Sequence, residues 1–174
     1  MDNNTKTNWN IDPAHSEINF KVKHMMISTV TGSFESFEGN VKAENPDFKN
    51  ANFSFTAKID SINTNNKDRD AHLKGDDFFG SEKFPELTFK SKLFDGSKMI
   101  GNLTIKGTTK EVPLDVAYNG TVVDPYGQTK AGFEIEGQIN RKDFGLAWSA
   151  VTEAGNVVVS DKIKLIASLQ FVKQ

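Results

Sequence analysis

The sequence contains no cysteine among its 174 residues. This excludes disulfides, thiol nucleophiles, thioredoxin-type redox chemistry, and zinc or iron–sulfur sites built on thiolates. No run of apolar residues approaches the ~18 that a membrane-spanning helix needs, so we expect no membrane span. The N-terminal residues are polar and lack the apolar stretch of a signal peptide. We therefore expect a cytoplasmic protein, or a periplasmic or secreted one if a signal has been removed.

The chain also lacks an excess of basic residues. Lysine and arginine number 21 against 23 aspartates and glutamates, which gives a formal charge of −2. We expect no nucleic-acid partner, because nucleic-acid binding requires a basic surface. The length fits one domain, and 37% hydrophobic with 25% charged residues is the composition of a soluble folded protein.

Tyrosine and tryptophan are scarce, with two of each, whereas phenylalanine occurs 14 times. Phenylalanine is the aromatic residue without a polar group, so these rings require a dry environment. That environment is either a core or a pocket.

Alternation of apolar and polar residues with a period of two dominates the chain and predicts β-strands. In residues 17–24, for example, the apolar residues share one face. Phe34 and Phe37 fall on opposite faces of the segment 28–44, so we expect a bulge near Ser36 that bends this strand. The last segment alternates for longest and predicts one long closing strand. The alternating segments are 17–24, 28–44, 52–60, 87–93, 99–106, 111–119, 130–140 and 156–172.

Only residues 66–79 break this alternation. Asn65 or Asn66 can cap a short helix there, and Gly75 suits its end. About eight two-faced strands joined by short turns favour a barrel, since closure removes exposed strand edges. We therefore predict an all-β fold with one short helix, built as an eight-stranded antiparallel β-barrel. A β-sandwich is the rival architecture.

The three histidines, His15, His24 and His72, form no recognised metal-binding motif. Three imidazoles can in principle hold zinc. Their spacing contains no HExxH motif and no pair at helical spacing, so we expect no metal and no cofactor. His24 lies on the apolar face of its strand near an end, where a barrel would have its mouth. It is either a hydrogen-bonded core residue or part of a pocket.

The predicted helix carries the densest group of unlike functional side chains, which includes Arg69, Asp70 and His72. Its basic groups can receive the polar head of a ligand. An arginine–aspartate pair can equally pin the helix across the end of a barrel. The same two interpretations apply to Arg141, Asp143 and Asp161.

Short motifs follow one another through nearly the whole chain: Trp9-x-Ile11-Asp12-x-x-His15-Ser16-x-Ile18-x-Phe20, Val22-x-His24, Gly32-x-Phe34-x-x-Phe37-x-Gly39, Ile62-x-Thr64, Arg69-Asp70-x-His72-Leu73, Asp77-Phe78-Phe79, Phe84-Pro85, Gly101-x-Leu103-Thr104-Ile105-x-Gly107 and Arg141-x-Asp143-Phe144-Gly145. Together they resemble the YceI-like family, and the ordered set is specific where each motif alone is weak. The resemblance implies a lipocalin-like barrel whose elongated apolar cavity holds a polyisoprenoid or another long-chain amphiphile. It also implies a homodimer and a bacterial stress-response role. From the sequence we expect a flexible segment over 1–8 and a single domain over 9–174.

We therefore expect a binding protein, with no catalytic residues, that carries or sequesters a polyisoprenoid, a quinone precursor or a fatty-acid derivative. His15, Arg69, Asp70 and His72 are candidates for head-group or structural contacts. One alternative is an enzyme that acts on an apolar substrate with His24 or His72 as a base or metal ligand. Another is a structural β-domain that only dimerises, with a solid core. The expected lining residues are Phe20, Val22, His24, Phe34, Phe55, Phe89, Leu103, Phe133, Ile135, Phe144 and Trp148, the last of these at the rim.

Overall fold

Strands make up most of the computed structural model, which describes residues 6–148 and 158–174. These residues include one α-helix, α1 (Lys67–Lys74), and the short 3₁₀ helices η1 (Pro13–His15), η2 (Ile59–Ser61) and η3 (Arg141–Phe144). None of the helices in these two stretches is long and apolar enough to cross a bilayer. The strands are β1 (Thr7–Ile11), β2 (Glu17–His24), β3 (Ser28–Phe34), β4 (Phe37–Ala43), β5 (Asn52–Lys58), β6 (Ile62–Asn63), β7 (Glu86–Phe94), β8 (Lys98–Ile105), β9 (Thr108–Val123), β10 (Thr129–Asn140) and β11 (Val159–Lys173).

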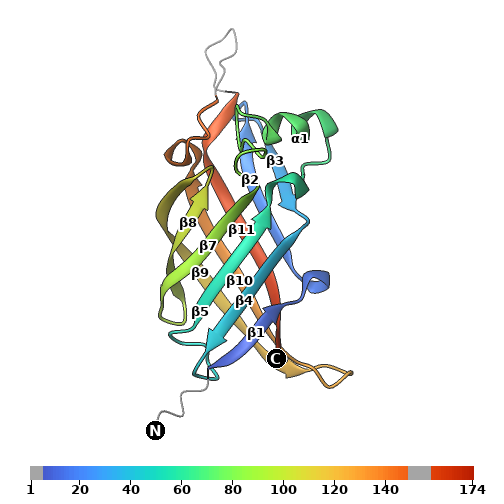
Figure 1. The fold of residues 1–174 in the computed structure, drawn as a ribbon, viewed down its shortest axis with the longest axis vertical. Coiled ribbons are helices and arrows are strands. Elements are labelled where there is room, and N and C mark those ends of the chain that lie inside the picture. The colour runs from blue at the N-terminus through green and yellow to red at the C-terminus, as the bar shows by residue number, and fades with distance from the viewer. Residues whose placement is uncertain (1–5, 149–157) are drawn as a thin grey trace.

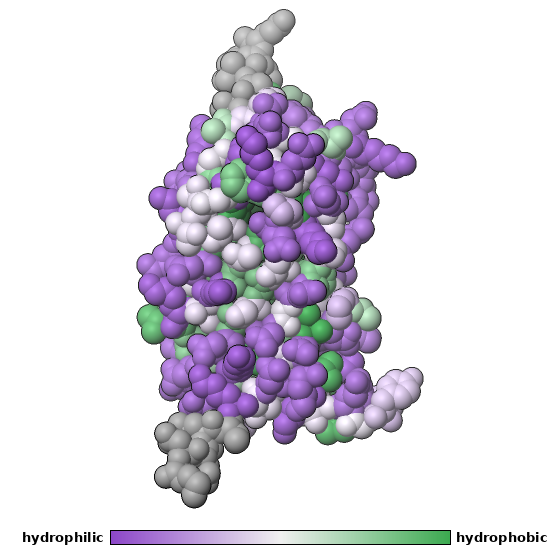
Figure 2. Space-filling view, in the orientation of Figure 1, coloured by the Kyte–Doolittle hydropathy of each residue, from purple (hydrophilic) through white to green (hydrophobic). Residues whose placement is uncertain are grey.

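Eight of these strands close into a barrel (Figure 1). They pair in the order β1, β4, β5, β7, β8, β9, β10 and β11, and β1 in turn pairs with β11. The predicted eight-stranded antiparallel barrel with one helix is therefore confirmed. Inward and outward residues alternate along each strand of a barrel, which explains the period of two in the sequence. Figure 2 shows a mostly hydrophilic outer surface, with apolar side chains visible at a few places near the middle of this face.

The segment 28–44 forms two strands, β3 and β4, so the expectation of one strand with a bulge near Ser36 is wrong. The chain turns a corner at Glu35 and Ser36, and its pairing changes there. β3 pairs with β2 and β6, whereas β4 pairs with β1 and β5. Because of this corner, Phe34 and Phe37 both pack against the core although their positions in the alternation differ.

β1 and β2 share one edge of the long strand β11. β2 pairs with the first part of β11 and β1 with its end. The 3₁₀ helix η1 separates them, capped by the side chain of Asp12. Thr7 and Asn8, which the sequence places in a flexible segment, belong to β1 because their backbones pair with Ala43 and Lys42. A polar run without alternation carries no signal for such a strand.

Helix α1 lies at the upper end of the barrel in Figure 1. The predicted ends of this helix are confirmed, with Asn66 as the cap. Its side chain accepts a hydrogen bond from the backbone N–H of Arg69, and Gly75 follows the last turn. This cap satisfies a backbone donor that the helix itself leaves free.

An aromatic floor closes the other end of the barrel, where β1 lies. The ring of Phe133 meets those of Phe48 and Phe53 edge-on, with centroids 5.0 and 5.4 Å apart. Such edge-to-face pairs add stability beyond the burial of area. The other members of the floor are Trp9, Phe94, Tyr118 and Phe171.

A lysine between two carboxylates joins η1 to the β9–β10 hairpin. The Nζ of Lys130 lies 2.9 Å from Oδ2 of Asp12 and 3.6 Å from Oδ2 of Asp124. The hydrogen bond from Lys130 holds the pKa of Asp12 below its ordinary value, against the opposing effect of burial, and His15 lowers this pKa further.

We expect the Asp12→Asn substitution to remove part of the acid sensitivity of folding. The folded pKa of Asp12 lies below the unfolded value of about 3.9, so its contribution is complete above that value and disappears as the pH falls through the folded pKa. At neutral pH the substitution should lower the free energy of unfolding by about 1 kcal/mol, and the loss should vanish in acid. Urea unfolding across pH measures this, with the exposed Asp60→Asn as control. An equal loss at neutral and acid pH would contradict it.

Candidate ligand cavity

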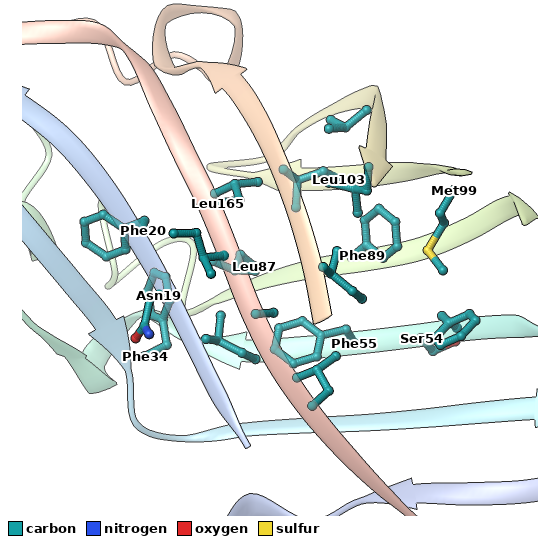
Figure 3. Close-up of a pocket in the computed structure, with 18 of the residues that line it drawn as sticks. Asn19, Phe20, Phe34, Ser54, Phe55, Leu87, Phe89, Met99, Leu103 and Leu165 are labelled. Atoms are coloured by element: carbon teal, nitrogen blue, oxygen red, sulfur yellow. The ribbon is translucent and has the colours of Figure 1, made fainter. Parts of the chain in front are cut away.

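An apolar cavity of about 140 Å³ lies inside the barrel next to the aromatic floor (Figure 3). Six strands of the closed ring, β5 and β7 to β11, contribute lining residues, together with β2 and β3. Asn19 and Ser54 are the polar residues of its described lining. The lining is Ile18, Asn19, Phe20, Phe34, Phe53, Ser54, Phe55, Leu87, Phe89, Met99, Leu103, Ile105, Val112, Leu114, Ile135, Leu165, Ile166, Ala167, Leu169 and Phe171.

Six residues that the sequence marks as lining residues lie in this wall. The sequence reasoning left out others, such as Phe53, Leu87 and Leu165, although each lies on the apolar face of an alternating segment. That face was the signal that could have found them. The six are Phe20, Phe34, Phe55, Phe89, Leu103 and Ile135.

Two glycines give phenylalanine rings room against the wall. A Cβ atom on Gly32 would lie 2.2 Å from the ring of Phe20, its cross-strand neighbour. A Cβ atom on Gly101 would lie 2.3 Å from the ring of Phe89. Each ring thus occupies the space over a residue without a side chain. This placement keeps the two rings out of the middle of the cavity.

Three of the expected lining residues lie on strands but at another depth. Phe133 belongs to the aromatic floor. Val22 and His24 lie nearer the upper end of β2, where His24 pairs with Val159 and Ser28. These three residues are not part of the lining of this cavity, because alternation indicates the face of a strand and says nothing of depth.

Phe144 and Trp148 also lie outside the cavity. Phe144 is buried within η3. Trp148 packs against His72 and Phe78, with ring centroids 5.3 and 5.4 Å apart. Both residues follow the last residue of β10, so the strand pattern could not place them.

Arg69 and Asp70 bind the chain's own Thr64. Asp70 accepts the backbone N–H and the hydroxyl of Thr64 over 2.9 and 2.5 Å. Arg69 donates to the hydroxyl and the carbonyl of Thr64 over 2.7 and 2.5 Å. Of the two interpretations of this pair, the geometry favours pinning the helix to the segment after β6.

His15 and His72 each face an aspartate. Nδ1 of His15 lies 2.8 Å from Asp12, and Nε2 of His72 lies 3.0 Å from Asp77. Neither histidine lines the cavity. Within residues 6–148 and 158–174, no group of three His, Asp or Glu side chains is arranged to hold a metal ion.

Arg141 is almost completely buried, with 1% of its surface exposed. Burial lowers the pKa of this guanidinium, and Asp161, whose carboxylate lies 3.6 Å away, opposes the shift. Its donors are used within the chain, so the structure favours a pinning role here as well. The carbonyl groups that accept them belong to Leu146, Trp148, Val159 and Ser160.

A second hollow of about 430 Å³ opens in the barrel wall beside η1. It shares Ser54 and Phe55 with the cavity. Phe37 packs against Phe55, with ring centroids 6.0 Å apart. Phe55 therefore borders both the apolar cavity and the more polar outer hollow. The rest of this hollow is lined by Asn10, Ile11, Pro13, Glu38, Gly39, Asn40 and Thr56.

The barrel and its motifs occur in known proteins. A model of the YceI-like domain matches residues 9–171. A UPF0312 protein of Staphylococcus aureus strain MSSA476 is 40% identical over 166 residues, which are 95% of this chain and 97% of that protein. The crystal structure of a Campylobacter jejuni YceI protein matches with a TM-score of 0.73 and 36% identity over 87% of this chain and 90% of that one. A polyisoprenoid binding domain from Saccharophagus degradans shares the fold, with a TM-score of 0.70 at 13% identity over 95% of this chain and 98% of that one. The resemblance carried by the motifs is confirmed, and the chain belongs to the YceI-like family.

Proposed function

We propose that this protein binds a long-chain amphiphile, such as a polyisoprenoid, a quinone precursor or a fatty-acid derivative, and carries or sequesters it. The observation that carries the proposal is the dry cavity, whose described lining is apolar apart from Asn19 and Ser54. A hydrocarbon chain gains roughly 0.8 kcal/mol per buried methylene without any specific contact. A small polar molecule would instead lose hydrogen bonds there. The Saccharophagus degradans domain of the same fold, named for polyisoprenoid binding, agrees with this proposal.

The size of the cavity determines how such a ligand must bind. A dry cavity of roughly 150 Å³ holds one benzene molecule. The cavity of about 140 Å³ therefore takes only a short part of a long chain, and the rest must displace side chains. Phe20, Phe55 and Phe89 are half-buried, whereas Phe48 and Phe133 of the floor are fully buried. We expect the chain to displace wall rings and to leave the floor intact.

The outer hollow offers a place for the polar end of the ligand. Asn10, Glu38 and Asn40 line this hollow and not the cavity, whereas Phe55 lines both. The apolar tail of the ligand would lie in the apolar cavity, and its polar head group would lie in the more polar hollow. Movement of the Phe55 ring would connect the two spaces.

A catalytic role for the histidines has less support. His24 and His72 lie outside the cavity, and its described lining contains no acid or base that could hold a proton near an enclosed substrate. The side chain of His72 is 43% exposed and faces Asp77 at the surface. Binding without catalysis is therefore part of the proposal. The homodimer, the cytoplasmic location and the lack of a nucleic-acid partner stay predictions.

Extraction of natively purified protein tests the proposed function. Organic extraction followed by mass spectrometry should find a long-chain amphiphile in near-stoichiometric amount. Delipidated protein should then be titrated with an isoprenoid alcohol and with a fatty acid. At a ligand concentration of about 100 times the dissociation constant, the free energy of unfolding should rise by about 2.7 kcal/mol. An empty extract together with no stabilisation by either ligand would leave the solid-core alternative standing.

A further inference from the structure

The β2–β3 turn carries exposed apolar side chains at the end of the barrel where α1 lies (Figure 1). Met26 is 65% exposed and Ile27 is 81% exposed. Met25 and Met26 both adopt left-handed backbone conformations, with φ of 49° and 59°. Turns of this kind favour Asn-Gly, because most other side chains are strained there. The turn therefore costs stability, and the exposed Met26 side chain recovers little of that cost by packing.

A basic stripe, defined as Lys21, Lys23, Lys162 and Lys164, runs from this turn along the outer wall. All four side chains are exposed. Lys21 and Lys164 stand directly opposite each other in the pairing of β2 with β11, an arrangement of like charges that destabilises a sheet. Within the described residues, none of the four lies in an ion pair. Their other cross-strand neighbours are uncharged: Thr29, Thr31, Gln138 and Asn140.

We propose that the turn and the basic stripe together dock the protein on a bilayer of anionic phospholipid. Strands rise about 3.3 Å per residue, so Lys23 and Lys21 lie about 10 and 17 Å from Met26 along β2. Apolar side chains of docked proteins enter the headgroup boundary by about 5–10 Å, which brings the nearer lysines level with the phosphates. The chain as a whole carries a charge of −2, so this attraction is local to the stripe.

The positive charge of the basic stripe favours an anionic bilayer, rather than a second copy of the chain, as the partner of this surface. In a symmetric dimer through this surface, the basic stripe of one copy would face that of the other. The β9–β10 hairpin at the opposite end also exposes apolar side chains, with Val122 at 66% and Tyr126 at 89%. Lys130 beside that hairpin is held between Asp12 and Asp124. That hairpin therefore provides a control with similar apolar exposure and without a stripe of four lysines.

Co-flotation with vesicles tests the docking surface in the absence of any added ligand. The protein should bind vesicles of phosphatidylcholine mixed with phosphatidylglycerol, and binding to phosphatidylcholine alone should be much weaker. Salt should weaken the binding because it screens the lysines. The double variant Lys21→Gln/Lys164→Gln should bind roughly 25-fold more weakly, since each lysine near the surface contributes about fivefold.

The turn variant Met26→Gly/Ile27→Ser separates docking from folding. Glycine relieves the left-handed backbone at position 26, so the urea midpoint should stay the same or rise. Vesicle affinity should nevertheless fall by roughly tenfold or more. The control Val122→Ser/Tyr126→Ser should bind like the unmodified protein. Light scattering on the same samples reports the oligomeric state.

Three results would overturn the docking proposal. They are equal binding to neutral and anionic vesicles, loss of binding in the control variant only, and a dimer that the turn variant disrupts. Each of them leaves the proposed function intact, because the docking surface lies outside the cavity and ligand binding is measured without vesicles.

Discussion

Substituting Ala167 by phenylalanine should abolish ligand binding while the barrel stays folded. Ala167 lines the cavity from β11, between Ile18 of β2 and Ile135 of β10. The substitution adds a phenyl ring, and a ring of that size fills a cavity of roughly 150 Å³. The cavity of about 140 Å³ would therefore be occupied by the protein itself.

The size of this effect follows from competition for one space. A ligand would have to expel the new ring before it could enter, so we expect its affinity to fall at least about 100-fold, or about 2.7 kcal/mol. Stability should change by less than about 2 kcal/mol, because filling a cavity and overpacking it have opposite effects. Titration of delipidated protein and urea unfolding measure the two quantities.

Ser168→Phe is the matched control for Ala167→Phe. Ser168 is the next residue of β11 and is exposed on the outer wall. The same ring there should leave ligand affinity unchanged. If both variants bind like the unmodified protein, the ligand does not occupy this cavity. If Ala167→Phe unfolds the protein, the smaller substitution Ala167→Leu would fill part of the cavity and should also lower the affinity for the ligand.

The strands could be predicted from the sequence because one physical rule governs all of them. A closed barrel buries one face of every strand, so apolar residues recur with a period of two. The ends of α1 could also be predicted from the sequence, since an Asn66 cap and a terminal Gly75 act through neighbouring backbone groups. These signals are local, and each is complete within a short stretch of chain.

Depth in the barrel could not be predicted, because it depends on how the strands are staggered. Phe89 and Phe133 have the same chemistry and the same inward orientation, yet one lines the cavity and the other belongs to the floor. The corner at Glu35 and Ser36 was missed for a similar reason. It reflects a change of strand partner, which no alternation within 28–44 encodes.

The role of Arg141 could not be predicted from the sequence either. Substitution of this residue should lower the free energy of unfolding more than any other substitution considered. The guanidinium donates to four backbone carbonyls, and these hydrogen bonds tie the start of η3 to the residues after it and to the start of β11. Arg141→Met keeps the apolar stem and leaves these acceptors without their donor. Each unsatisfied buried group costs about 1–3 kcal/mol, so we expect the free energy of unfolding to fall by about 3 kcal/mol or more.

Arg141→Lys and Lys142→Met separate the hydrogen bonds of Arg141 from its charge. Lysine is a point charge and cannot reach four separated carbonyls, so Arg141→Lys should recover less than half of the loss. Lys142 pairs with Asp161 at 3.3 Å but is exposed, and its substitution by methionine should cost less than about 1 kcal/mol. Urea unfolding of the three variants measures these differences. Because the four acceptors of Arg141 are carbonyl groups of the chain itself, its pinning role also requires that Arg141→Lys retain ligand affinity in the fraction that folds. A loss of affinity in folded Arg141→Lys would instead assign this residue to a polar head group.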